Sequence, residues 1–99
     1  MSTASPQAAF DTGGYGPSNA ARVRIGEKAF RWLLDEVRGH RLKPAEAVHA
    51  LGLMLRLTEQ FCVHRKSDLI VLATGLAESE AVHRDVRSAA ARIVAVATG

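Results

Sequence analysis

At 99 residues, the chain is long enough for one domain and too short for two separate hydrophobic cores. Its net charge is only +3, which is weak evidence for a nucleic-acid partner, and 47% of its residues are hydrophobic. No apolar run is long enough for a membrane helix, and the N-terminus lacks the basic and apolar regions of a secretory signal. The single cysteine, Cys62, cannot form an internal disulfide, so we expect a cytoplasmic location.

Residues 1–17 are rich in Ser, Thr, Pro and Gly and contain only two large side chains, Phe10 and Tyr15. Such a segment buries too little apolar surface to offset the entropy of ordering it. We therefore expect a flexible N-terminal arm. It is either a tail with no binding role or a docking arm that becomes ordered on a partner.

The first helix is predicted to start with Ser18 or Asn19 as its N-cap and to end at Gly39. One stripe of this helix is charged, and the rest of its circumference is mostly apolar. The apolar arc is wide enough to contact two neighbouring elements. We interpret the charged stripe as a solvated face stabilised by i,i+4 ion pairs; it consists of Arg24, Glu27, Lys28, Arg31, Asp35 and Arg38.

A second helix is predicted from Pro44 to about His64, because proline suits a first helical turn and Glu46 complements the helix dipole there. Its polar residues form a narrow stripe, so the helix is expected to be central in the fold. The following run, residues 69–75, is apolar throughout, and its periodicity does not separate a buried strand from a helix. No other segment offers a strand partner, which favours a short third helix ending near Gly75.

A fourth helix is predicted to begin with Ser79 as its N-cap and to present a face of small apolar residues. The chain is therefore expected to be all-α: residues 18–99 form a single helical domain, a small bundle of three to four helices. The alternative is a small α/β fold with one strand at residues 69–74.

The sequence Glu-Ala-Val-His occurs twice, at residues 46–49 and 80–83. In carboxylate-bridged di-metal bundles, two helices each supply Glu-x-x-His, so Glu46, His49, Glu80 and His83 are candidate metal ligands. However, both copies fall at predicted helix starts, where Glu is favoured by the dipole without any metal. We therefore favour helix-start chemistry and keep the di-metal bundle as the third hypothesis for function.

Basic residues cluster before the second helix, at Arg38, Arg41 and Lys43, and again after it, at Arg65 and Lys66. A helix of about twenty residues separates the two groups by roughly 30 Å. A monomer therefore presents no single basic patch, although a dimer could align the groups along a duplex. Cations at helix C-termini also have a simpler role in satisfying the helix dipole.

The sequence contains no nucleophile motif, phosphate-binding glycine loop or zinc-ligand spacing. We therefore expect no enzymatic activity and no cofactor. Surplus apolar surface on so small a domain is usually covered by a partner or another copy. We expect a non-enzymatic protein that acts through protein–protein association, as an adaptor, regulator or assembly subunit, and that forms a homo-oligomer; a regulatory protein binding nucleic acid is the alternative. The expected interface anchors, unless they complete a monomer's core, are Phe30, Trp32, Leu34, Met54, Leu57 and Phe61.

Overall fold

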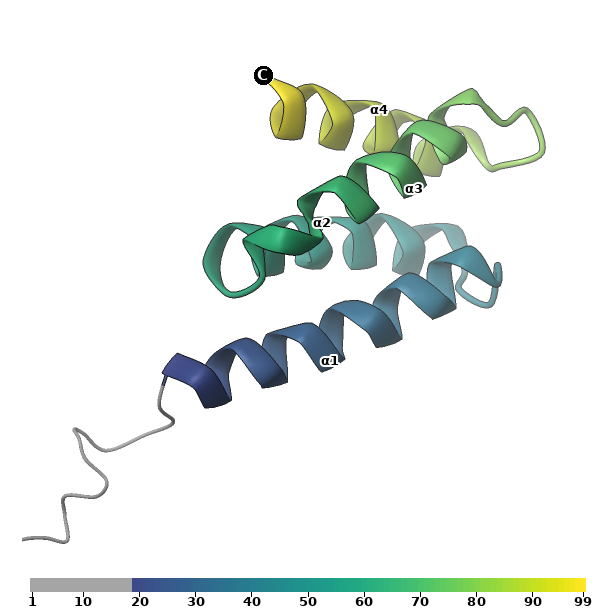
Figure 1. Cartoon of the computed structure of the whole chain (residues 1–99). Coiled ribbons are helices and arrows are strands. Elements are labelled where there is room, and N and C mark those ends of the chain that lie inside the picture. The colour runs from purple at the N-terminus through teal and green to yellow at the C-terminus, as the bar shows by residue number, and fades with distance from the viewer. Residues whose placement is uncertain (1–18) are drawn as a thin grey trace, which may run out of the picture.

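The computed structural model describes residues 19–99, and four α-helices account for most of them (Figure 1). These are α1 (Asn19–Arg38), α2 (Pro44–Gln60), α3 (Lys66–Glu78) and α4 (Arg84–Thr98), with a 3₁₀ turn, η1 (Val63–Arg65), between α2 and α3. No strand occurs in this part of the chain, so the all-α prediction is confirmed and the alternative strand at residues 69–74 is wrong. The predicted arm over residues 1–17 lies outside the described residues.

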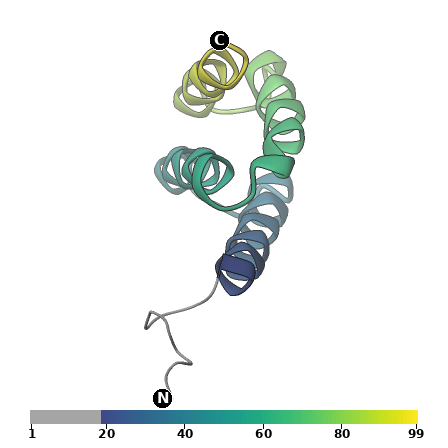
Figure 2. The ribbon, with the colours of Figure 1, turned by 60° about the vertical axis from the view of Figure 1, so that its left-hand side comes forward.

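The helices form two layers. Viewed nearly along the helices, α2 and α4 lie on one side while α1 and α3 lie on the other (Figure 2). The helix α4 packs against α2 and α3, whereas α1 packs against α2 and only slightly against α3, and no contact joins α1 to α4. As a result α1 is the peripheral helix. None of the four helices is both long enough and apolar enough to cross a membrane.

The hydrophobic core is built from one face of each helix. Buried positions recur at spacings of three and four residues along α1, α2 and α4, as expected for amphipathic helices around a common core. Phe30 of α1, Leu51 and Met54 of α2 and Leu69 of α3 are fully buried. The helix α4 contributes Ala89 and Ala90 and a few aliphatic side chains, and its small residues allow α3 to approach closely.

The C-terminus of α1 differs from the predicted glycine cap. The amide of His40 donates to the Val37 carbonyl (3.1 Å) and that of Arg41 donates to the Glu36 carbonyl (3.2 Å). These two bonds make a Schellman motif, in which one residue adopts the left-handed conformation. That residue is His40, with φ of 55°, and not Gly39. The turn therefore places a histidine where glycine is usually found.

Three other predicted helix boundaries are wrong. The helix α3 ends at Glu78, not near Gly75. The helix α2 ends at Gln60, not near His64, because the amides of Phe61 and Cys62 both donate to the Leu57 carbonyl and the chain leaves the helix there. The helix α4 begins at Arg84, not after Ser79. Its N-cap is His83, whose Nδ1 accepts a hydrogen bond from the Asp85 amide (3.1 Å).

The N-terminal half of α1 is attached to the rest of the domain mainly around Gly26 and Glu27. Gly26 is buried, and a Cβ atom at this position would lie 2.7 Å from Cβ of Phe61. The carboxylate of Glu27 lies between His64 Nε2 (2.6 Å) and the Arg65 guanidinium, whose Nη2 is also 2.6 Å away. Close backbone approach and an ion-pair cluster together hold α1 against the corner between α2 and α3.

Candidate protein-interaction surface

The six predicted anchor residues are placed very differently by the fold. Phe30, Leu34 and Met54 lie in the core and are not available at the surface of the chain. Leu57 and Phe61 are half-buried, and Phe61 covers Gly26. Trp32 alone is mostly exposed, at 61% of its surface. Trp32 is therefore the only one of the six predicted anchors whose side chain is mostly exposed in a single chain.

An apolar groove lies beside Trp32, between α1 and α2, with a volume of about 460 Å³. Leu33 and Ala50 are buried side chains at its base, while Leu42 and Leu53 are half-buried and remain in contact with the core. We call this feature the Trp32 groove; its lining residues are Trp32, Leu33, Leu42, Ala45, Glu46, His49, Ala50 and Leu53. The lining is almost wholly apolar, so the groove suits a hydrophobic side chain and offers few polar partners.

The Trp32 groove continues along α1 as an apolar stripe. Ile25 and Ala29 precede Trp32 by seven and three residues, so all three side chains fall within about 60° of one another around the helix. Ile25 is 61% exposed, and Ala29 is half-buried. We call Ile25, Ala29 and Trp32 the α1 stripe. Exposed apolar side chains in such a row are typical of a docking surface, whereas isolated ones are ordinary.

The two Glu-Ala-Val-His segments occupy different structural positions. Glu46 lies in the first turn of α2, where its Oε1 accepts a hydrogen bond from the Lys43 amide (3.0 Å). The second copy lies in the connection before α4, and His83 is the N-cap of that helix. Within residues 19–99, no three His, Cys, Asp or Glu side chains gather into a metal-binding group. Glu46 and His83 thus both have helix-capping roles, and His49 and Glu80 are exposed.

The predicted basic residues fall at the two ends of α2. Arg38, Arg41 and Lys43 lie at or beyond the C-terminus of α1, and Arg65 and Lys66 lie about 25 Å away at the start of α3. Arg41 is paired with Glu36 (3.0 Å), and the Arg65 guanidinium contacts two carboxylates. These ion pairs lower the positive potential that a phosphate backbone would meet. Nucleic-acid binding through these residues stays a prediction.

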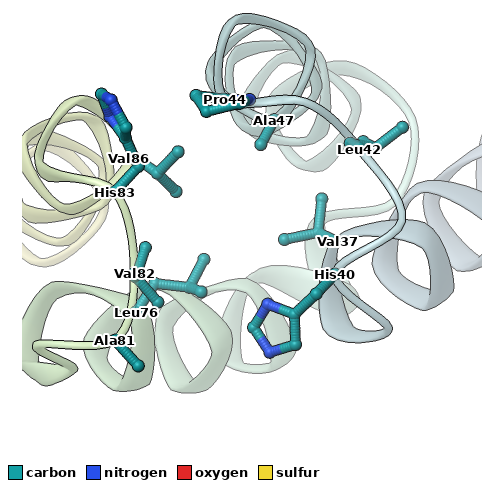
Figure 3. Close-up of a pocket in the computed structure, with 10 residues that line it drawn as sticks. All are labelled: Val37, His40, Leu42, Pro44, Ala47, Leu76, Ala81, Val82, His83 and Val86. Carbon is teal, nitrogen blue, oxygen red and sulfur yellow. The ribbon is translucent and has the colours of Figure 1, made fainter.

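A smaller cavity, of about 160 Å³, lies where the α1–α2 turn meets the connection between α3 and α4. Figure 3 shows aliphatic side chains such as Val37, Val82 and Val86 around it, with the rings of His40 and His83 on opposite sides. No carboxylate or thiol lines the cavity. Within this cavity the two imidazoles therefore face neither a nucleophile nor a third metal ligand, and the nearby carboxylate of Asp85, 3.8 Å from His83 Nδ1, lies outside the lining.

The Glu27 cluster is a contact that local sequence patterns do not reveal. The interaction joins α1 to residues 37 and 38 positions later in the chain. Hydrogen bonds from His64 and then Arg65 hold the pKa of Glu27 below its ordinary value. Arg65 also donates to Asp68 (2.7 Å), and that bond and the one to Glu27 raise the pKa of the guanidinium. The cluster serves the attachment of α1, and both of its carboxylates are held in ion pairs.

The neighbouring thiol is buried as well. Cys62 is fully buried, and its burial raises the pKa of the thiol. Its Sγ lies 3.4 Å from the Leu57 carbonyl, to which it donates a weak hydrogen bond. A thiol that is buried and protonated is a poor nucleophile, so Cys62 acts as a small core residue.

Comparison with protein-family models, curated proteins and solved structures finds no match for this chain. Any functional statement therefore rests on the residues of the chain itself. Among residues 19–99, Trp32 is the only aromatic residue with an exposed side chain, and it lies beside an apolar groove.

Proposed function

We propose that this is a non-enzymatic helical protein that acts by binding another protein chain through the Trp32 groove, as an adaptor, regulator or assembly subunit. The exposure of Trp32 carries the proposal. Tryptophan is highly buried on average in folded proteins, and at interfaces it is among the residues that contribute most to binding. Here 61% of its surface faces water beside further apolar surface.

The shape of the groove favours a helical partner segment. Its walls are the two helices α1 and α2, and core residues such as Leu33 and Ala50 fix its base. An amphipathic helix can lay its apolar face into such a groove and leave its polar face in water. Because the walls are held by the core, little ordering entropy is lost on binding, which favours affinity.

Photo-cross-linking at single sites tests the proposal. A photo-reactive residue is introduced at Trp32 and, in a matched control, at Val71, which is 70% exposed on α3 and lies outside the groove. We expect illumination of living cells to give a discrete protein adduct from position 32, identified by mass spectrometry. The same treatment should give none from position 71.

A contradictory result would be an absence of adducts at position 32, or the same adducts at both positions. Trp32 is the only tryptophan of the chain, so its fluorescence provides a second measurement. Its emission should shift to shorter wavelength, and its quenching by acrylamide should fall, when the identified partner is added. An unchanged spectrum at saturating partner would show that binding does not cover the groove.

A further inference from the structure

We infer that the chain that occupies the Trp32 groove is a second copy of this protein, with the two α1 helices antiparallel across a two-fold axis close to Trp32. The inference rests on the proposed function and names its partner. Its basis is the distribution of charge beside the α1 stripe, which is self-complementary in that arrangement.

Two opposite charges flank Trp32 on the same side of α1. Lys28 precedes Trp32 by four residues and Asp35 follows it by three, so both side chains lie about 40° to 60° from Trp32 in the same direction around the helix. Along the axis they lie about 6 Å before and about 4.5 Å after Trp32. Both residues are exposed.

A two-fold axis near Trp32 converts this pattern into two ion pairs. When a second α1 runs antiparallel beside the first, Lys28 faces Asp35 of the partner subunit, and symmetry repeats the pair on the other half of the interface. A parallel arrangement would instead place Lys28 beside Lys28 of the partner subunit. The charge pattern therefore favours the antiparallel one, in which Trp32 of each copy packs on the stripe and groove of the other.

Neither charge is paired within the part of the chain that the structure describes. In residues 19–99 Lys28 and Asp35 take part in no ion pair, although Arg31 lies one helical turn before Asp35. By contrast, Glu27 and Glu36 of the same helix are each paired with residues outside it. Other charged residues of α1 also take part in no ion pair within residues 19–99, but they lie about 80° or more from Trp32 around the helix, farther than Lys28 and Asp35; they are Arg22, Arg24, Arg31 and Arg38.

Charge exchange across the interface tests the inference on the full chain. The association of wild type, K28D, D35K and their equimolar mixture is measured by analytical ultracentrifugation from micromolar to millimolar concentration. The wild type should dimerise. Each single variant places two like-charge pairs in its homodimer, so its dissociation constant should rise about tenfold.

The mixture of K28D with D35K is the decisive sample. In the heterodimer both contacts again join opposite charges, so association should return to nearly the wild-type level. The difference between the mixture and the single variants should be larger at low salt, where the charges are less screened. The variant W32A should abolish dimerisation, while V71A, on α3 and outside the Trp32 groove, should leave it unchanged. Circular dichroism should show the same helical content in every variant.

The outcomes separate this inference from the proposed function. A wild-type chain that stays monomeric, or a mixture that associates no better than its components, overturns the second-copy arrangement. If position 32 then cross-links to a different protein, the proposed function stands with another partner. If neither dimer nor adduct is found, both proposals fail.

Discussion

The helix α1 and the α3–α4 pair differ in the apolar side chains that they leave exposed. In α1 these include the only exposed aromatic side chain of residues 19–99, whereas in the pair the large exposed ones are the valines Val71 and Val96. In the α3–α4 pair, small residues such as Ala73 and Ala90 are fully buried because the two helices lie close together. In α1, Phe30 is fully buried while Ile25 and Trp32 are each 61% exposed. The apolar arc of α1 is wider than the single face that this fold covers.

This difference separates two uses of hydrophobic residues. Where an apolar residue meets the core on every side, it stabilises the fold. Where no neighbouring helix covers an apolar residue, that residue stays exposed and can contact a partner. The helix α1, for example, makes no contact with α4. Phe30 and Trp32 show both cases within three residues, because positions two apart on a helix point about 160° away from each other.

The largest expected effect is the loss of a core aromatic from α1. Phe30→Ala should lower the free energy of unfolding by about 3–5 kcal/mol, since it removes a fully buried ring and leaves a cavity. Trp32→Ala, the matched control, should change it by about 0.5 kcal/mol or less when measured at concentrations where the chain is monomeric. Urea unfolding followed by circular dichroism provides both values.

Equal destabilisation by the two substitutions would contradict the comparison, because it would mean that Trp32 is packed within one chain. A small loss for Phe30→Ala would mean that α1 contributes little to the stability of the core. In either case the Trp32 groove would need to be described differently.

A smaller effect is expected where α1 approaches Phe61. Gly26→Ala places a Cβ atom 2.7 Å from Cβ of Phe61, so α1 must move outward and stability should fall by about 1–3 kcal/mol. Gly52→Ala on α2 is the matched control, because no atom lies within 4 Å of its added Cβ. There the better helix propensity of alanine should raise stability by about 0.5–1 kcal/mol.

Thermal unfolding of the two glycine variants gives the sign of each effect directly. If Gly26→Ala were as stable as Gly52→Ala, the close approach between α1 and Phe61 would not exist in solution. Hydrogen exchange sharpens the test. In Gly26→Ala, the amides in the first half of α1 should exchange faster than the amides of α3.

The sequence predicts the fold class well because helical periodicity is a local property. The run at residues 69–75 was ambiguous in itself, and the lack of any strand partner correctly favoured the helix that became α3. Helix termini are predicted less accurately. His40 and His83 perform capping roles that other residues usually fill, and α2 ends where the Phe61 and Cys62 amides both donate to the Leu57 carbonyl. Residue type alone gives little indication of such roles.

The proposed interaction surface is predictable from the sequence only in part, for a related reason. Size and hydrophobicity identified Phe30, Met54 and Trp32 as anchors, but these properties do not show which face of α1 another helix will cover. That depends on the packing of α2 and α3, which is a long-range property. The contact between Glu27 and Arg65 is also long-range, and local periodicity marked Glu27 only as part of a solvated stripe.

The smallest expected effect concerns acid, and it also acts on the attachment of α1. The pKa of Glu27 is lower in the folded chain than its ordinary value, because His64 and Arg65 hydrogen-bond to its charged form. The unfolded chain therefore binds a proton at Glu27 more readily than the folded chain does. The stabilisation is fully present above the ordinary pKa and is lost as the pH falls through the lower, folded value.

Glu27→Gln should remove this contribution, so its urea midpoint should fall less steeply than that of the wild type between neutral pH and about pH 3.5. Glu59→Gln is the matched control, because Glu59 is exposed and forms no ion pair within residues 19–99; its profile should follow the wild type. If the profiles of Glu27→Gln and the wild type were parallel, the ion-pair cluster would not hold α1 in solution. The close approach of Gly26 to Phe61 would then be the main attachment of its N-terminal half.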